Sequence, residues 1–192
     1  MRRIIVILSL LVFGSYLVKA IDQNDDIYAA IKNEDVGKVE ITLALDPDAV
    51  NSVVEKKYTP LHFAAEHGSS NGAEILKLLV GKGANVEAKN HIGQTPLFIA
   101  VACDNPVGAR ILIADGAKVD SRQNDGRTPL HWAAVNGYCD VARVLIANKA
   151  NKKTRDSDGD TPLDLALEER SKAKGNPNLI KQYDDMIALL RE

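Results

Sequence analysis

The serine with the most suggestive neighbours in this 192-residue sequence is Ser70. It stands at the centre of Gly68-Ser69-Ser70-Asn71-Gly72, which has the glycine-serine-glycine spacing of a hydrolase nucleophile elbow. That motif works only on a turn from a strand into a helix, whereas this string separates two segments with helical patterning. No glycine-rich loop with lysine and serine or threonine at phosphate-binding offsets is present either. We therefore predict no catalytic residues and no enzyme activity.

The carboxylates that alternate from Asp156 through Asp158 to Asp160 resemble the start of a calcium loop, because calcium prefers hard oxygen ligands. The loop would need glycine at its sixth position and glutamate at its twelfth, and the sequence has Thr161 and Leu167 there. Weak calcium binding stays open as an alternative. The four histidines show no metal-ligand spacing, so the sequence predicts no metal and no cofactor; they are His62, His67, His91 and His131.

The two cysteines, Cys103 and Cys139, have two interpretations. If the chain is exported, an oxidising compartment would allow them to form a disulfide. The alternative is two separate thiols, which is favoured because the two residues occupy different positions in the repeat described below.

The first twenty residues have the pattern of a signal peptide. A basic start with Arg2 and Arg3 precedes an apolar run, and small side chains at Val18 and Ala20 suit cleavage after residue 20. The chain is thus expected to be secreted or periplasmic, with a mature chain from 21 to 192 and no membrane contact after cleavage. An uncleaved anchor is the alternative, although the 15 residues from 4 to 18 fall short of the roughly 20 that span a bilayer.

The charge of the mature chain argues against nucleic acid as a partner. Without residues 1–20 it has 21 basic and 26 acidic residues, a formal net charge of −5. Binding to a phosphate backbone requires a concentrated basic face, and the basic residues near 152–155 alternate with acidic ones. We predict no nucleic-acid binding.

An internal repeat dominates the rest of the sequence. A Thr-Pro-Leu block begins at Thr59, Thr95, Thr128 and Thr161, at intervals of 36, 33 and 33 residues. In each unit the threonine can cap a helix, and the proline after it occupies the first helical position, where its missing N–H costs nothing. A break, a second amphipathic helix, a glycine at the helix end and a tight turn follow. Each unit is therefore predicted to be helix, turn, helix, hairpin.

This pattern, Thr-Pro-Leu-His-x-Ala at a 33-residue period, resembles the ankyrin repeat, and the chain looks like an exported bacterial-type member of that family. The resemblance implies an all-α solenoid of about five units with capping terminal repeats. The expected repeats cover residues 24–57, 58–93, 94–126, 127–159 and 160–192, the first being degenerate. His62 and His131 are expected to form structural hydrogen bonds next to the cap.

Three departures from the repeat carry expectations of their own. Residues 69–71 account for the longer first interval and are expected to lengthen the turn between two helices. Phe98 and Asp164 replace the block histidine, which puts the hydrogen bonds there in doubt. A last helix after Pro177 should turn polar residues outward, as a terminal repeat must; these are Lys181, Gln182, Asp184, Asp185, Arg191 and Glu192.

The resemblance also implies where a partner would bind. Ankyrin arrays use a concave face built from hairpin tips and first helices, and the chain is expected to bind another protein there as a monomer. Carried onto this chain, the expected contact residues are Tyr58, His67, His91, Ile92, Gln94, Asn124, Arg127, Trp132 and Asn136. An ordinary solvated position is the alternative for each. The predicted function is an interaction module or scaffold; the alternative is an accessory factor or subunit that supports a periplasmic enzyme.

Overall fold

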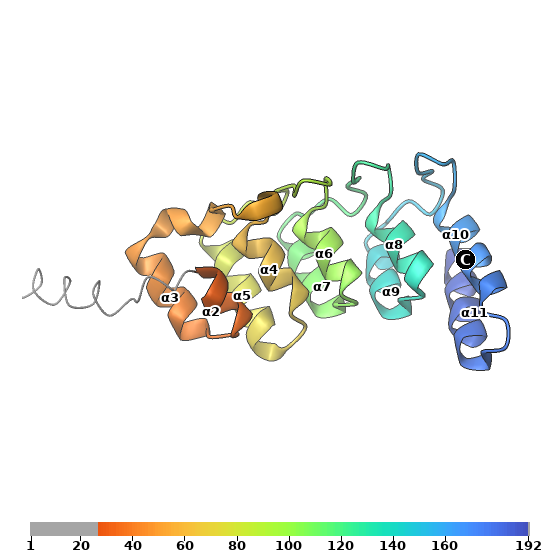
Figure 1. Cartoon of the computed structure of the whole chain (residues 1–192), viewed down its shortest axis with the longest axis horizontal. Coiled ribbons are helices and arrows are strands. Elements are labelled where there is room, and N and C mark those ends of the chain that lie inside the picture. Colours follow the sequence, from red (N-terminus) through yellow and green to blue (C-terminus); the bar gives the residue numbers. More distant parts are fainter. Residues whose placement is uncertain (1–26, 192) are drawn as a thin grey trace, which may run out of the picture.

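Residues 27–191 are described by the computed structural model, and they contain helices and loops but no strand. Within this range, ten α-helices follow one another in five pairs (Figure 1). Their bounds are α2 Ile27–Lys32 and α3 Val36–Leu45, α4 Pro60–Glu66 and α5 Ser70–Gly81, α6 Pro96–Ala102 and α7 Pro106–Ala114, α8 Pro129–Asn136 and α9 Cys139–Ala147, α10 Pro162–Lys172 and α11 Pro177–Arg191. The predicted all-helical repeat fold is confirmed; the predicted signal peptide, residues 1–20, lies outside the described residues.

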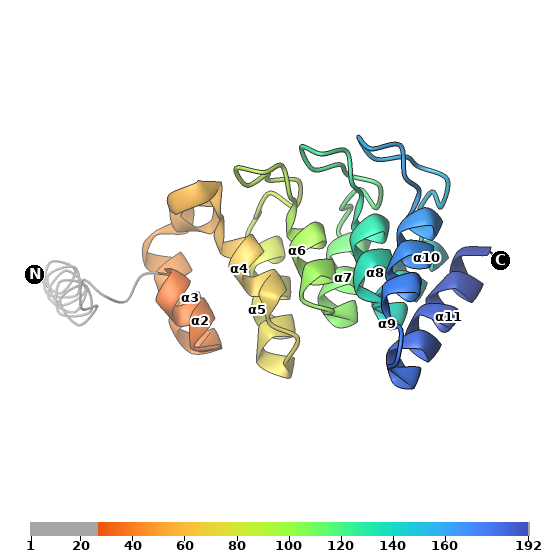
Figure 2. The ribbon, with the colours of Figure 1, turned by 45° about the vertical axis from the view of Figure 1, so that its right-hand side comes forward.

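The five pairs stack in chain order as two layers. The first helices of the pairs contact one another from α2 through α4, α6 and α8 to α10, and the second helices do so from α3 through α5, α7 and α9 to α11. The connections between pairs extend beyond one end of the helices (Figure 2). In the N-terminal connection these are two short 3-10 helices, Pro47–Asn51 and Glu55–Lys57, and in the others they are hairpins. Within residues 27–191 no helix is long and apolar enough to cross a membrane.

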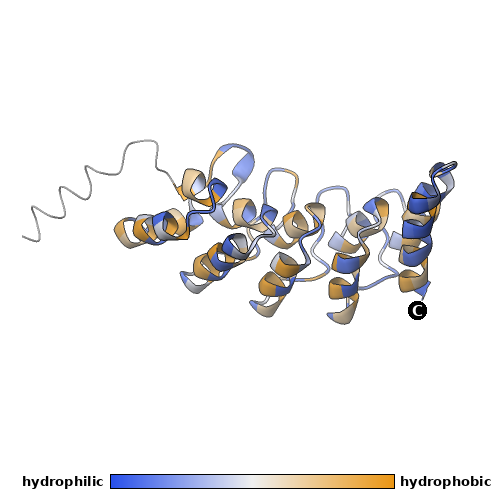
Figure 3. Cartoon of the chain, turned by 90° about the horizontal axis from the view of Figure 1, so that it is seen from below, coloured by the Kyte–Doolittle hydropathy of each residue, from blue (hydrophilic) through white to orange (hydrophobic). Residues whose placement is uncertain are grey.

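Small side chains let the first helices pack closely. The alanine pairs Ala64-Ala65 and Ala133-Ala134 are completely buried, as are the leucines Leu61, Leu97 and Leu130 of the repeated block. Hydrophobic residues run along every helix pair, and hydrophilic ones are most frequent at the C-terminal end of the stack (Figure 3). The apolar side chains form one continuous cluster from Ile27 to Leu190. The interior is therefore shared between repeats.

The block histidines join one repeat to the next. Nδ1 of His62 accepts a hydrogen bond from the backbone N–H of Thr59 at 3.2 Å, and Nε2 lies 3.1 Å from the carbonyl oxygen of Gln94 in the following repeat. His131 repeats this arrangement with Thr128 N–H at 3.1 Å and the Asp160 carbonyl at 3.1 Å. Both imidazoles are fully buried. The predicted structural role is confirmed, and it reaches across a repeat boundary.

At the two positions where Phe98 and Asp164 replace the block histidine, the start of the helix is kept and the hydrogen bond to the next repeat is lost. At Thr161 the carboxylate of Asp164 accepts from the threonine N–H at 3.0 Å and from its hydroxyl at 2.7 Å, so the cap remains reciprocal. At Thr95 the hydroxyl accepts weakly from the N–H of Phe98 at 3.4 Å. The Phe98 ring is buried and lies 5.7 Å from the ring of Trp132. An apolar contact between repeats thus replaces the polar one.

The expectation that residues 69–71 lengthen a turn is wrong. Ser69 caps α5 by accepting from the N–H of Gly72 at 2.9 Å, and Ser70 and Asn71 already belong to the helix. Three residues add almost one helical turn, and α5 has 12 residues where α7 and α9 have 9. Because Ser69 caps the helix, the inserted residues extend α5 and do not lengthen the turn.

The expectation that Gln182 faces solvent is also wrong. Its side-chain amide donates to the carbonyl oxygens of Asn136 at 3.4 Å and Gly137 at 3.0 Å, at the end of α8. The other polar residues named for the outer side of α11, from Lys181 to Arg191, are exposed; Glu192 lies outside the described residues. Gln182 points inward because the last carbonyls of a helix need donors that the helix itself cannot supply.

Two glycines allow the cost of a left-handed backbone to be measured separately from the cost of close packing. They give the first prediction. Gly116 has φ +91° and open space where an alanine would place its methyl group, whereas at Gly93, with φ +84°, that methyl would lie 2.5 Å from Oδ1 of Asn124. Gly116→Ala should lower the free energy of unfolding by about 1–2 kcal/mol, the cost of left-handed backbone for an L-residue. Gly93→Ala should cost roughly 1 kcal/mol more.

Urea unfolding of both variants measures this difference. Gly81→Ala is the control, because Gly81 lies in a helix with nothing within 4 Å of the added methyl. It should be neutral or stabilising. Equal losses at Gly93 and Gly116 would show that neighbouring hairpins do not approach as closely as described.

The buried histidines give a pH prediction. Burial lowers the pKa of His62 and of His131 below the ordinary value of 6.5, against the opposing effect of the carbonyls of Gln94 and Asp160. As the pH falls, these histidines therefore bind protons in the unfolded chain before they do so in the folded chain. Their contribution to stability is fully present above about pH 6.5 and decreases below it. The melting temperature should fall between pH 7.5 and pH 5.5.

The matched variants identify the histidines responsible for that fall. His62→Gln plus His131→Gln should melt at a lower temperature at pH 7.5 and show a flatter pH dependence, whereas His91→Gln, at an exposed site, should behave like the wild type. The explanation fails if the double variant keeps the full pH dependence.

Candidate partner-binding surface

Three hairpins and the exposed side of the first helices form one surface, which we call the hairpin face. The hairpins cover residues 88–94, 121–127 and 154–160. Each is closed by a backbone hydrogen bond from a residue at the same repeat position, namely Asn90 to Gln94, Gln123 to Arg127 and Asp156 to Asp160, all at 3.0 Å. The glycine in each turn, such as Gly126 with φ +79°, adopts the left-handed backbone that such turns require.

Backbone hydrogen bonds also link each hairpin to the connection before it, which is a 3-10 helix for the first hairpin and a hairpin for the other two. The N–H of His91 donates to the carbonyl of Lys56 at 2.9 Å, that of Asn124 to Ile92 at 3.0 Å, and that of Ser157 to Asp125 at 2.9 Å. The same bond therefore recurs between each two successive connections. The hairpin tips form a ladder along the stack.

The residue before each block threonine reaches across to the next hairpin. Burial raises the pKa of Tyr58, and the side chain of Asn90 in the next hairpin lies close enough to oppose that shift. The amide of Gln94 donates to Oε1 of Gln123 at 3.1 Å, and Nε of Arg127 donates to Oδ2 of Asp156 at 3.2 Å. Gln94 is only 7% exposed. Three of the expected contact residues thus hold the hairpins together.

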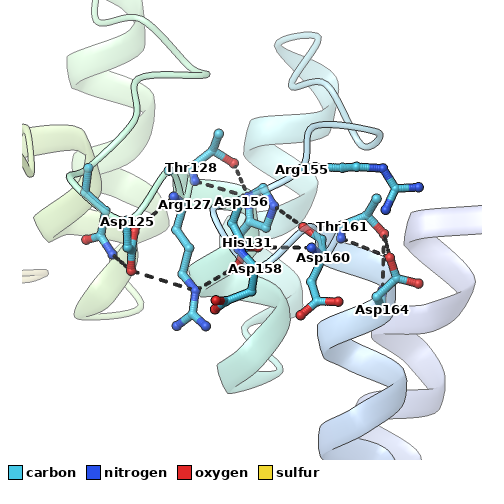
Figure 4. A network of polar contacts seen from close by, with 12 residues as sticks. Asp125, Arg127, Thr128, His131, Arg155, Asp156, Asp158, Asp160, Thr161 and Asp164 are labelled. Carbon is cyan, nitrogen blue, oxygen red and sulfur yellow. Dashed lines mark hydrogen bonds and ion pairs between the residues drawn. The ribbon is translucent and has the colours of Figure 1, made fainter.

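Figure 4 shows the densest part of this network, around Asp156. Its Oδ1 accepts from the N–H groups of Asp158 at 3.1 Å and Asp160 at 3.0 Å, and its Oδ2 accepts from Arg127. Burial opposes ionisation of Asp156, but these donors together with the charge of His131 lower its pKa below the ordinary value. The carboxylate that suggested a calcium loop therefore closes the hairpin. In residues 27–191 no group of three or more histidine, cysteine or acidic side chains is placed to hold a metal.

Tyr58 and His91 line a hollow at the N-terminal end of the hairpin face. Its volume is about 510 Å³, and its walls are Val54, Glu55, Lys56, Tyr58, Phe63 and His91. The rings of Tyr58 and Phe63 meet edge to face at 5.5 Å between centroids, and Tyr28 supports Phe63 in the same way at 5.1 Å. Ile92, which follows His91, is 41% exposed. The hollow therefore has aromatic walls, and an exposed apolar residue follows one of its lining residues in the chain.

The other expected contact residues divide between the hairpins and the far ends of the first helices. Asn124 is exposed and donates to the carbonyl of His91 at 3.3 Å, and Trp132 is half-buried in α8. His67 and Asn136 lie at the C-terminal ends of α4 and α8, away from the hairpins. His67 pairs with Glu34 at 3.2 Å, and Asn136 donates to the carbonyl of Trp132 at 2.9 Å. The nine residues do not form a single patch.

The two apolar residues of the hollow, Val54 and Phe63, were not anticipated from the sequence. Phe63 occupies the same repeat position as Trp132, so the reasoning that selected Trp132 applied to Phe63 as well. Val54 is 38% exposed and its neighbour Val53 is 64% exposed. An apolar pair in a segment between helices was the available signal.

The two cysteines are free thiols in different repeats. Cys103 is an exposed residue at the end of α6, but partial burial of its thiol together with the charge of Glu66 raises the pKa of that thiol. Cys139 begins α9, and its thiol donates to the carbonyl of Gln182 at 3.7 Å. Each thiol therefore has surroundings of its own.

Comparison with known proteins adds to this geometry. A family described as ankyrin repeats (3 copies) matches residues 27–123, 69–156 and 117–182. The chain is 37% identical over 68 residues to an ankyrin repeat protein, OPG189, of vaccinia virus strain Western Reserve, which covers 35% of this chain and 12% of the viral protein. It is 37% identical over 65 residues to an ankyrin repeat-containing protein, P1E11.10, of Schizosaccharomyces pombe, covering 33% of this chain and 30% of the yeast protein.

A third similarity is to alpha-latrotoxin-Lhe1a of Latrodectus hesperus, at 34% identity over 90 residues, which is 45% of this chain and 6% of the toxin. The chain thus matches less than a third of the length of each of these relatives. The match to the repeat family, in contrast, extends through nearly all the described residues. Together with the stacked helix pairs and the repeated caps, it shows that the chain belongs to the ankyrin repeat family.

Proposed function

We propose that the chain binds a protein partner through the hairpin face, with an apolar side chain of the partner seated in the hollow beside Tyr58. Ankyrin repeats are generally protein-interaction modules, and the family is typically a non-enzymatic scaffold. The observation that supports the proposal most directly is the hollow itself, since it combines aromatic walls with exposed apolar residues. Soluble proteins rarely expose grouped apolar side chains without a binding role.

The chemistry of the hollow favours a large apolar group. Tyr58 and Phe63 offer ring edges and faces, and Val54 offers an aliphatic wall. Glu55, Lys56 and His91 at the walls can donate or accept hydrogen bonds with the backbone of a bound segment. An apolar centre with a polar rim is the usual anatomy of a protein interface.

The hydrogen-bonded ladder between hairpins supports the proposal in a second way. Because Asn124 and Ser157 are fixed to the preceding hairpin through their N–H groups, the loops lose little conformational freedom on binding. Preorganised loops bind more tightly for the same contacts, since the ordering cost is already met in folding. Tyr58, Gln94 and Arg127 contribute to this rigidity, and we assign the partner contacts mainly to Val54, His91 and Ile92.

A charge placed on the apolar rim should weaken binding. Val54→Asp plus Ile92→Asp puts two carboxylates where an apolar group of the partner would be desolvated, and should weaken binding at least about tenfold. The measurement is quantitative mass spectrometry of proteins captured by the mature chain from its native compartment. Both positions are exposed, so the melting temperature should stay within a few degrees of the wild type.

Ile41→Asp supplies the control for this experiment. Ile41 is 48% exposed on α3, in the layer of second helices, and has no contact with the hairpin face in the proposed complex. Proteins captured by the wild type and by the Ile41 variant, and lost from the rim variant, are the expected result. Identical capture by all three proteins would refute the assignment of the hollow.

We further propose that the chain is exported and that residues 1–20 are removed. The basic start, the apolar run and the small residues before position 21 support this proposal. N-terminal sequencing of the protein recovered outside the cytoplasm should begin at Ile21. Val18→Arg plus Ala20→Arg should block cleavage, because the processing site requires small side chains, while Lys19→Arg should be processed normally. A mature protein that still begins at Met1 would disprove cleavage.

A further inference from the structure

A second hollow lies on the opposite layer of the molecule, between the neighbouring second helices α7 and α9. Its volume is about 420 Å³, within the range of sites that hold small molecules or side chains. The lining residues are Pro106, Arg110, Asp140, Arg143, Val144, Ala147 and Asn148. None of them belongs to a hairpin, so this cleft is separate from the hairpin face.

The two arginines of the cleft are equivalent by repeat position. Arg110 is the fifth residue of α7 and Arg143 the fifth residue of α9. Both are exposed, and within residues 27–191 neither forms an ion pair or a side-chain hydrogen bond. The arginines of the hairpins differ, because Arg122, Arg127 and Arg155 all donate to carbonyl or carboxylate oxygens. The two guanidinium groups of the cleft therefore have donors to offer.

The charge of the cleft favours an anion. The lining holds two guanidinium groups and one carboxylate, that of Asp140, which is a net charge of +1 in a chain whose formal net charge is −2. Asp104 is not part of the lining but is close enough to Asp140 to interact with its charge. The planar fork of arginine donors matches the two oxygens of a carboxylate better than a lysine does. Pro106, Val144 and Ala147 supply an apolar floor between the two arginines. A ligand that satisfies both features carries carboxylates joined by an apolar part.

The equivalent positions of the arginines on neighbouring helices suit a peptide segment. Neighbouring packed helices are about 8–10 Å apart, and equivalent positions on them are separated by a similar distance. In an extended polyproline-type chain, residues i and i+3 lie on one side and about 9.3 Å apart. Two glutamates or aspartates at that interval would each meet one arginine, with the intervening side chains over the apolar floor.

We propose that the cleft between α7 and α9 binds an extended acidic segment of a partner protein, with two carboxylates three residues apart and an apolar residue between them. This interaction is independent of the hollow on the hairpin face, and it gives the stack a second docking surface. A partner that bridges both layers, or two partners at once, fits the arrangement.

The test titrates the full mature chain with a short peptide, Gly-Glu-Leu-Pro-Glu-Gly, blocked at both ends, and follows NMR spectra of the protein. The side-chain Nε–H signals of Arg110 and Arg143 are assigned with the variants Arg110→Lys and Arg143→Lys. Both signals should shift along one saturating curve, together with the backbone amides of Val144 and Ala147. The same peptide with glutamine in place of glutamate should cause no comparable shift.

Matched variants separate the cleft from general charge attraction. Arg110→Ala plus Arg143→Ala should weaken binding at least about tenfold, as expected when two charge-assisted contacts are lost. Lys118→Ala plus Lys153→Ala removes the same charge from two loop positions and should leave the affinity unchanged. Unchanged melting temperatures confirm that both double variants are folded.

Several outcomes would overturn the proposal. Equal shifts with the glutamine peptide would show that carboxylates are not recognised. Unchanged affinity in the arginine double variant, or shifts confined to residues outside the cleft, would place the peptide elsewhere. Glutarate binding as tightly as the peptide would mean that the cleft attracts isolated anions and does not recognise a segment.

Discussion

No helix pair among residues 27–191 can bury its apolar side by itself, and the rest of the described structure depends on that constraint. A pair such as α6 and α7 has 7 and 9 residues, too short to be stable alone in water. Its buried leucines and alanines are covered only when the neighbouring pairs are in place, and the result is one continuous apolar cluster. Polar contacts then fix the register of neighbours, because the imidazoles of His62 and His131 each join a helix cap to a carbonyl in the next repeat. Stability in such a stack is a sum over repeats and their interfaces.

The same constraint shapes the surface. The positions before Thr59, Thr95 and Thr128 are used to connect hairpins, so their side chains serve folding and hold the binding face rigid at once. The side chains left free for a partner are those that the ladder does not use, such as Val54 and Ile92 on the hairpin face and Arg110 and Arg143 on the other layer. Specificity in this chain is expected to reside in such residues, because the frame they stand on is common to the family.

The sequence was sufficient to predict the helix pairs, their caps and the turns, and insufficient to predict the two hollows. Caps, helix breaks and turn glycines are local features, so Thr128, Gly137 and Gly126 could be interpreted from their neighbours alone. The insertion at 69–71 was misjudged because inserted residues that include a capping serine can lengthen the following helix as readily as they lengthen a loop. Gln182 was misjudged because its partners, the carbonyls that end α8, are 45 and 46 residues away. The hollow beside Tyr58 combines residues from 54 to 91, and its shape depends on the packing of Tyr28 against Phe63.

Amide hydrogen exchange at the repeat boundaries tests the central claim most directly, namely that each hairpin is held by the connection before it. The N–H groups of His91, Asn124 and Ser157 donate to Lys56, Ile92 and Asp125. If the ladder exists in solution, these three amides should exchange nearly as slowly as amides within α6 and α8, because opening them requires separating two repeats. Exchange at the rate of an unstructured peptide, with the helix amides still protected, would show that the hairpins are independent loops and would contradict the account of a rigid binding face.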